Sequence, residues 1–273
     1  MLVLCERRSA SMVNTFLKYI SFEKRYSQHT VNSYQNDLAQ FEQYCLEKFQ
    51  TSDLIDATQL MIRSWILTLM DDGITPNTVN RKLASLRSFY KFLLKREAVK
   101  KDPTARIKSL KVAKDLPEFA NENEFSDFLN RIEFKNDFEG LLEQIILELL
   151  YGTGIRLSEL LGLKVSDFKS GDSTIKVLGK RNKERVIPVS AHLNALIKKY
   201  IDEKSHVFLH DYDSYLIVNK KGGKAYPMMI YRIVKKYLDQ IQSLDKKSPH
   251  ALRHTYATHL LNKGADLNAV KDL

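Results

Sequence analysis

The chain has 273 residues, 44% of them hydrophobic and 28% charged, and it carries a net charge of +10 at pH 7. This composition excludes wholesale disorder, and neither a membrane span nor a signal peptide is recognisable in the sequence. Only two cysteines occur, Cys5 and Cys45, with no CxxC pair and no His/Cys cluster. Disulfides and structural zinc are therefore not expected, which favours a reduced, cytoplasmic location.

The positive charge is concentrated in residues 81–108, which hold ten basic residues against Glu97 and Asp102. Clustered cations gain binding free energy by releasing counterions from phosphates, so a polyanion such as nucleic acid is the favoured partner. A solvated helix face is one alternative. An anionic membrane surface is a weaker one, because the apolar side of this stretch has the spacing of a buried face.

Residues 12–100 read as a small helical bundle with one strongly basic helix. Residues 1–11 match no period, and Met12 is an alternative to Met1 as the start of the protein. Apolar spacings of three and four, together with capping residues and prolines, define the expected helices. These are Val13–Phe22, a long helix that starts at Ser27 or Gln28 and reaches Phe49, Ala57–Met70, and a helix opened by Thr75–Pro76 with Val79, Leu83, Leu86, Tyr90 and Leu93 buried.

Residues 109–118 show no period and are predicted to link two domains, 12–108 and 119–273. The second domain is expected to be mainly helical with a small antiparallel sheet. Its strands are the extended runs 174–178 and 185–189, joined by the basic turn 179–183. The expected helices are one that begins near Asn121, one over Phe138–Tyr151, a short one that begins at Arg156, and three more over 190–202, 227–241 and 249–263. A last helix begins at Asp266 and the sequence stops inside it, which indicates a chain cut within an element.

Three segments carry residues suited to binding a phosphate. Arg156 follows two glycines at a helix start, where a guanidinium and backbone N–H groups can bind one anion; a surface ion pair with Glu159 is the alternative. Lys180 lies in a charged hairpin turn, where a lysine is usually only solvated. His250 and Arg253 are three residues apart on one helix face.

Two further histidines, His254 and His259, lie on the same segment and are interpreted as structural residues. His250 and His254 have the i, i+4 spacing of metal ligands, but no acidic third ligand is close, so a metal site is discounted.

The order and number of these segments resemble the tyrosine recombinase (phage integrase) family, most closely its Xer-type members. The matching blocks are YSxxTxxSYxxDL (Tyr26 to Leu38), NRKLASLRSFYKFL, GTGIRLSELLGL, GKRNKERVIPV and PHALRHTYATHLL. The resemblance implies an N-terminal helical core-binding (SAM-like) domain and an α+β catalytic domain. It also implies that Arg156 and Arg253 bind the scissile phosphate, that His250 is an acid/base residue, and that Lys180 is the hairpin lysine.

Candidate DNA contacts lie in the first two blocks and in the hairpin. They are Thr30, Ser33, Arg81, Arg87, Lys91, Arg181 and Lys183. Arg181 stands where the Xer pattern usually has glycine, which could change how the turn approaches DNA.

The implied reaction is attack of a tyrosine oxygen on a phosphodiester, through a 3′-phosphotyrosyl intermediate, without metal or nucleotide cofactor. In the family the nucleophilic tyrosine follows a Leu-Gly-His block that would come after Leu273, and none of the 13 tyrosines stands in that place. Tyr256 belongs to the helix of His250 and Arg253. The 273-residue chain is therefore expected to bind DNA without cleaving it.

The expected partners are a double-stranded recombination site held between the two domains, a second protomer in a homo- or hetero-tetramer, and a divisome DNA translocase, with no membrane. Chromosome dimer resolution is the favoured process and integration of a mobile element the alternative. A DNA-binding protein that does no chemistry on the same fold is a second hypothesis. A metal nuclease is a weaker third, because no convergent Asp/Glu cluster is apparent.

Overall fold

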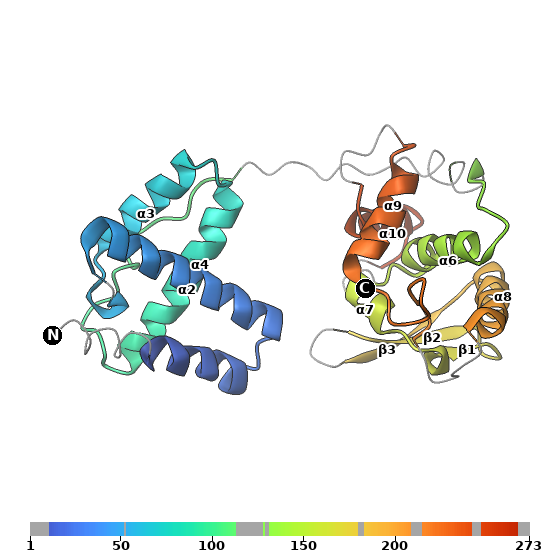
Figure 1. Ribbon diagram of the computed structural model, residues 1–273, viewed down its shortest axis with the longest axis horizontal. Coiled ribbons are helices and arrows are strands. Elements are labelled where there is room, and N and C mark those ends of the chain that lie inside the picture. Colours follow the sequence, from blue (N-terminus) through green and yellow to red (C-terminus); the bar gives the residue numbers. More distant parts are fainter. Residues whose placement is uncertain are drawn as a thin grey trace. The chain divides into compact units, whose positions relative to one another are not determined.

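The computed structural model describes residues 11–51, 53–112, 128, 131–179, 183–208, 215–241 and 247–266. The chain forms two compact units, Met1–Asp115 and Leu116–Leu273, each with its own hydrophobic core (Figure 1). No helix in the described ranges is long and apolar enough to cross a membrane. Most of the predicted linker, and the helices expected near Asn121 and after Asp266, lie outside the described residues.

The first unit is a bundle of helices whose starts are fixed by capping side chains. A helix over 11–18 continues into the π-turn η1 (Tyr19–Glu23), and α2 (Gln28–Phe49), η2 (Leu54–Asp56), α3 (Gln59–Asp71) and α4 (Pro76–Lys95) follow. Ser27, Thr58 and Thr75 each accept a backbone N–H at the start of α2, α3 and α4. The predicted starts of α2 and α4 are confirmed, whereas the helix expected from Ala57 begins two residues later.

The core of the first unit is rich in aromatic residues. Phe16, Phe41 and Phe89 are fully buried, and the rings of Phe16 and Phe89 meet edge to face with centroids 5.3 Å apart. The face of α4 predicted to be buried is confirmed at all five of its positions: Val79, Leu83, Leu86, Tyr90 and Leu93. Arg81, Lys91 and Lys95 of α4 are left at the surface of the bundle, whereas Lys82 and Ser85 are buried.

The second unit combines helices with a three-stranded antiparallel sheet in the order β1-β2-β3, so the predicted fold class is confirmed. Its elements are α6 (Phe138–Thr153), α7 (Leu157–Gly162), η3 (Val165–Asp167), β1 (Phe168–Lys169), β2 (Thr174–Leu178), β3 (Glu184–Pro188), α8 (Ala191–Phe208), α9 (Pro227–Leu238) and α10 (Pro249–Asn262). The strand β1 was not expected from the sequence, since two residues are too few to show a period, and α8 runs six residues beyond the predicted 202.

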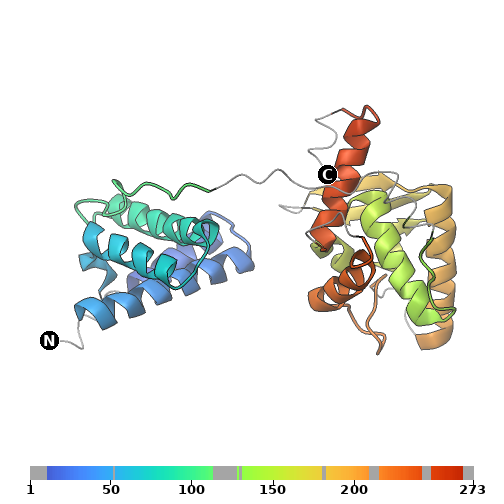
Figure 2. The same cartoon turned by 90° about the horizontal axis from the view of Figure 1, so that it is seen from above.

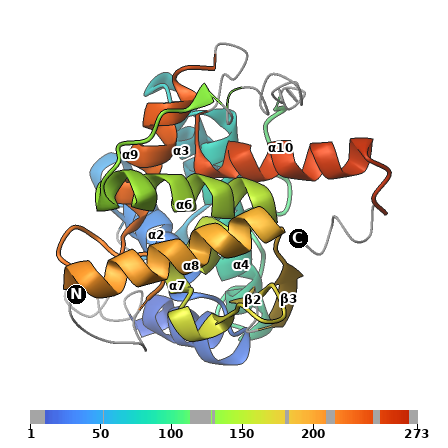
Figure 3. The same ribbon diagram turned by 90° about the vertical axis from the view of Figure 1, so that its right-hand side faces the viewer.

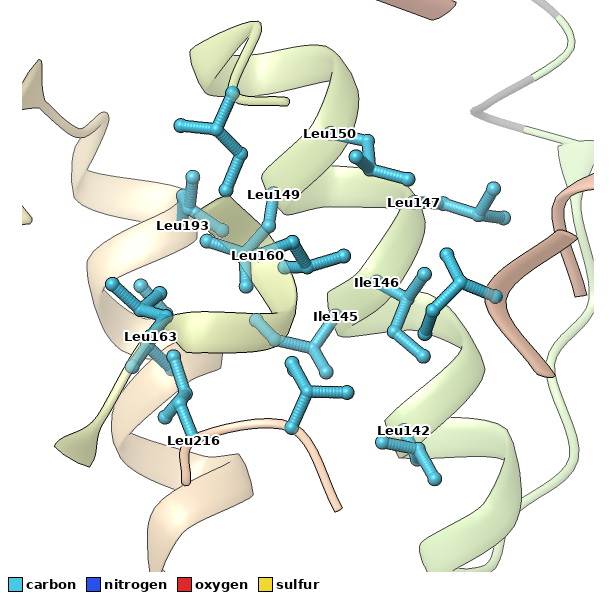
Figure 4. Close-up of a cluster of buried hydrophobic side chains, with 14 of the residues drawn as sticks. Leu142, Ile145, Ile146, Leu147, Leu149, Leu150, Leu160, Leu163, Leu193 and Leu216 are labelled. Carbon is cyan, nitrogen blue, oxygen red and sulfur yellow. The ribbon is translucent and has the colours of Figure 1, made fainter. Parts of the chain in front are cut away.

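Helix α6 is the centre of the second unit. It is apolar around most of its circumference, and α8 lies beside it in two views (Figures 2 and 3). Leu149, Leu160 and Leu193 converge from α6, α7 and α8 in the core (Figure 4). A helix buried on several sides is fixed in place by its neighbours. The C-terminal end of α6 is therefore rigidly held, and this fixes where the next turn and α7 begin.

Candidate functional site

A sharp turn joins α6 to α7 and places Arg156 at the start of α7. Gly154 adopts the left-handed conformation (φ 60°) and ends α6, with its N–H donated to the Leu150 carbonyl. A Cβ on Gly154 would also overlap the ring of Tyr256, so only glycine fits this turn. The turn therefore sets both the direction of α7 and the position of Arg156.

Glu159 lies one turn into α7 and holds Arg156 by two hydrogen bonds. The Arg156 backbone N–H donates to Oε2 at 2.7 Å, and Arg156 Nη1 donates to Oε1 at 2.9 Å. The Glu159 side chain is 2% exposed and that of Arg156 is 39% exposed. The ion pair with Glu159 that the sequence left as an alternative to phosphate binding is present, yet the Arg156 side chain remains partly exposed.

Arg185, on β3, makes a second and fuller contact with the same carboxylate. Its Nη1 and Nη2 donate to Glu159 Oε1 and Oε2 at 2.8 and 2.9 Å. Burial alone would raise the pKa of Glu159, but the hydrogen bonds from Arg185 and Arg156 outweigh it and the pKa is lowered. Glu159 is therefore a buried, ionised anchor for two arginines.

Arg253, on α10, joins this group through the turn after α6. Its Nη1 donates to the Gly154 carbonyl oxygen. Burial lowers the pKa of Arg253 to about 10, and the nearby charges of Arg156 and Arg185 act in the same direction while Glu159 opposes them. Arg253 thus stays protonated at neutral pH, close to Arg156 and Arg185. Arg156 and Arg253 are 97 residues apart in the sequence, and the turn at Gly154 brings them near one another.

His250 precedes Arg253 by one turn of α10 and lies near the positive charges of Arg253 and Arg156. Partial burial lowers the pKa of His250, and His254, Arg253 and Arg156 lower it further. The ring is therefore neutral near pH 7 and can accept a proton. Its ring is 5.2 Å from that of His254, centroid to centroid.

The two remaining histidines of α10 differ from each other. The structural role predicted for His259 is confirmed, because its buried ring Nδ1 is 3.0 Å from the Tyr151 hydroxyl. The same prediction is wrong for His254, which is exposed and contacts His250 instead. In the described ranges no group of three or more His, Cys, Asp or Glu side chains is placed to hold a metal ion.

The hairpin between β2 and β3 closes beside these arginines. The Gly179 N–H donates to the Lys183 carbonyl at 2.7 Å. A Cβ on Gly179 would lie 3.1 Å from Arg185 Nη1 and 3.5 Å from Glu159 Oε1. Lys183 is exposed at the end of this turn, while Lys180 and Arg181 lie outside the described residues. The residue before Lys180 is therefore packed against the Glu159–Arg185 pair.

In the first unit, a buried carboxylate organises part of the predicted DNA-contact set. Asp37 on α2 accepts hydrogen bonds from Arg81 at 2.5 and 2.9 Å, from Lys82 at 3.2 Å and from Ser85 at 2.7 Å. Arg81 Nη1 also donates to Ser33 Oγ at 2.5 Å, and the Arg81 side chain remains 47% exposed. Lys82, counted with the basic surface in the sequence, is buried, because Asp37 and Gln40 supply its partners.

The other predicted contacts of the first unit are Arg87, Lys91 and Thr30, which do not bond to Asp37. Arg87 donates to the Ile107 carbonyl at 2.5 Å and to Ser109 Oγ at 3.1 Å, so it also ties down the segment after α4. Lys91 is exposed and lines a groove of about 790 Å³ with Arg87, Lys24 and Lys95. Thr30 bonds to the capping Ser27 at 2.9 Å.

Sequence reasoning did not identify Arg185 or Asp37 as parts of these sites. Glu159 stands three residues after Arg156, a spacing that already indicates a contact across one helical turn. Arg185 is 26 residues from Glu159 in the sequence, and Asp37 is 44 residues from Arg81. Contacts over such separations cannot be predicted from the spacing of residues within a helix or strand.

Two family profiles match the sequence. One is described as "Phage integrase, N-terminal SAM-like domain" and covers residues 13–97; the other, "Phage integrase family", covers residues 118–273. Tyrosine recombinase XerC of Staphylococcus epidermidis is 35% identical over 265 residues, which is 95% of this chain and 86% of that protein. Tyrosine recombinase XerC of Natranaerobius thermophilus is 36% identical over 264 residues, or 94% of this chain and 87% of that protein.

Solved structures show the same fold at lower identity. The Tn1549 transposon integrase in complex with transposon right end DNA gives a TM-score of 0.75 at 19% identity, over 95% of this chain and 89% of that one. XerH site-specific recombinase bound to its difH substrate gives a TM-score of 0.69 at 20% sequence identity, and the match covers 95% of this chain and 87% of that one. The two profiles together, and each XerC relative by itself, cover nearly the whole chain. The chain therefore belongs to the phage integrase family of site-specific tyrosine recombinases, which are DNA strand transferases.

Proposed function

We propose that this protein binds a double-stranded recombination site and holds one phosphate of the DNA on Arg156 and Arg253. The observation that carries this proposal is the convergence of Arg156, Arg253 and the neutral His250 around the turn at Gly154. Arg156, Arg185 and Arg253 together outnumber the single carboxylate of Glu159 by two formal charges. An excess of that sign and size suits a phosphodiester that gains negative charge as it is attacked.

The residues then have distinct roles in strand transfer. Two guanidinium groups bind the nonbridging oxygens through fixed, permanently charged donors. His250 accepts or passes a proton, and Lys180 on the hairpin protonates the leaving 5′ oxygen. A phosphotyrosyl bond conserves the energy of the phosphodiester, so rejoining would need no nucleotide cofactor.

Named relatives support the proposed partners. The Tn1549 integrase and XerH structures are complexes with DNA, and a lambda integrase structure with a TM-score of 0.69 is a tetramer bound to a Holliday junction. We accordingly propose duplex DNA and a second protomer, in a homo- or hetero-tetramer, as partners of this chain. A divisome DNA translocase is proposed as a further partner.

The process served by recombination has two candidates. Relatives named XerC favour chromosome dimer resolution. The likeness of the fold to a transposon integrase favours movement of a mobile element. A genetic assay can separate the two processes. It compares recombination between two copies of a chromosomal site with integration of a circular element.

DNA affinity should fall steeply as salt rises, because phosphate contacts release counterions. Replacing Lys91 by Ala should weaken binding uniformly across DNA sequences and reduce the slope of log affinity against log salt by about one. Fluorescence anisotropy with several duplexes at graded salt measures both quantities. Lys176→Ala, on the exposed face of β2, serves as a matched cation removal. An affinity that stays flat with salt would contradict binding through phosphates.

The 273-residue chain should bind a recombination site and form no covalent adduct with it. Tyr256, the tyrosine nearest Arg253 in sequence, packs against Gly154 and Tyr151, and burial raises its pKa, so it is poorly placed to attack. A duplex nicked beside the cleavage position traps any adduct, which a denaturing gel then separates. A DNA-linked band would overturn this expectation, and its loss in Tyr256→Phe would identify the nucleophile.

A further inference from the structure

Glu159 is held more completely by Arg185 than by Arg156. Arg185 gives both terminal nitrogens to the carboxylate, one to each oxygen, whereas the Arg156 side chain gives one. The Arg185 side chain is 22% exposed, and its Nε is buried with no hydrogen-bond partner among the residues that the structure describes. A guanidinium that leaves a buried N–H unpaired is kept in this orientation by its other contacts.

This division of contacts leaves Arg156 available. Of the five N–H donors of its guanidinium, one is taken by Glu159 within the described part of the chain. A lone carboxylate facing Arg156 would attract the whole guanidinium into a bidentate pair. A carboxylate has about four acceptor sites. Arg185 takes two of those on Glu159 and the Arg156 backbone N–H takes a third, so one site remains for the Arg156 guanidinium, whose other donors can face an external anion.

Arg185 also connects the hairpin to the arginine site. It lies on β3 opposite Val177 of β2, so its position follows the register of the hairpin. Gly179, the last described residue before Lys180, approaches Arg185 Nη1 so closely that a Cβ would lie a tight 3.1 Å from it, and the same Cβ would be in ordinary contact with Glu159 Oε1. Helix α7 lies beside β2 in two views (Figures 1 and 3), and β3 pairs with the other edge of β2.

We propose that Arg185 is a positioning residue: it compensates Glu159 so that Arg156 is free to bind the phosphate, and it fixes the lysine-bearing hairpin to α7. The proposal rests on the proposed function, because it takes Arg156 to be a ligand of the phosphate. Arg185 itself contacts Glu159 and need not touch DNA. Its removal should therefore abolish the contribution of one particular phosphate to DNA affinity and leave the contributions of the other phosphates unchanged.

The test compares binding to DNA that carries, or lacks, charge at single phosphates. A bound duplex is first selected from a random pool, and a neutral methylphosphonate is then placed at successive central positions. For the unaltered chain we expect one position at which the methylphosphonate lowers affinity by about tenfold, the loss of a charge-assisted hydrogen-bonded contact. In R185Q this ratio should approach one, because affinity for the unmodified duplex falls by about tenfold while affinity for the duplex with the methylphosphonate at that position changes little.

Three further variants identify the route of the effect. If Arg185 acts through Glu159, then R185Q should change the ratio less in an E159Q background, so the two substitutions should be non-additive. R185K should restore the ratio only in part, since an ammonium cannot make the bidentate contact. K176Q, which removes a cation from the exposed side of the same hairpin, should leave the ratio unchanged.

The outcomes separate the proposal from the function on which it rests. If no position is sensitive in the unaltered chain, the proposed phosphate site itself is wrong. If a position is sensitive and R185Q keeps the full ratio, or if R185Q and E159Q are additive, Arg185 is not a positioning residue. Equal weakening of all duplexes by R185Q, or loss of folding by both R185Q and R185K, would assign Arg185 to structure alone and overturn the proposal.

Discussion

Replacing Arg156 or Arg253 by Ala should lower the rate of strand cleavage by roughly a thousandfold, while folding and most DNA affinity remain. Each guanidinium supplies fixed donors to charge that appears only as the phosphate is attacked, so its loss acts on the transition state more than on binding. We proposed above that the 273-residue chain does not cleave DNA, so the measurement is single-turnover cleavage of a nicked site by a variant supplied with a nucleophilic tyrosine, with affinity determined in parallel.

Lysine variants sharpen this result. Arg156→Lys and Arg253→Lys keep the charge but lose the planar pair of donors, so they should recover little of the rate. Lys183→Ala, at the exposed end of the hairpin, serves as the control for removing a nearby cation, and we expect it to lower affinity more than rate. Near-normal cleavage by Arg156→Ala or Arg253→Ala would remove that residue from the proposed site.

Replacing Asp37 by Ala should destabilise the first unit by about 3–5 kcal/mol. The substitution leaves Lys82 buried without its carboxylate and takes from Arg81 the partner that orients it. Trp65 is the only tryptophan of the chain and lies in the core of this unit, so its fluorescence during urea denaturation reports on the unit by itself.

Two further variants separate the effect of the charge of Asp37 from the effect of its size. Asp37→Asn keeps the size of the side chain and some of its hydrogen bonds, so its stability should fall between that of the unaltered protein and that of Asp37→Ala. Glu47→Ala removes an exposed carboxylate from the same helix and should change stability by no more than about 0.5 kcal/mol. A loss below about 1 kcal/mol in Asp37→Ala would show that the buried ion pairs contribute little.

Features governed by neighbours in sequence could be predicted well. Ser27 and Thr75 cap α2 and α4 as expected, and the buried face of α4 follows the helical period, because both depend on residues within one or two turns. The predicted start of α3 is wrong because Asp53 caps a competing turn, Leu54–Asp56, through its own side chain. A local rule fails where two local signals compete for the same backbone.

The motif residues of the second unit could also be selected from the sequence, since the resemblance rests on blocks that include Arg156, His250 and Arg253. Their grouping is a property of the tertiary structure. Gly154 links them: its carbonyl accepts from Arg253, and its missing side chain makes room for Tyr256. No spacing along the chain indicates a contact across 99 residues.

What the sequence by itself determined is most of the helices that the structure describes, the two strands of the hairpin and the residue types that can bind a phosphate, because caps, periods and motifs are short-range signals. Only the tertiary structure decided which charges pair with one another. It buried Lys82 against Asp37 and paired Arg185 with Glu159, leaving Arg156 partly free. The physical reason is that the partner of a charge is set by the packing of whole helices and strands, which follows from the fold and not from any stretch of sequence.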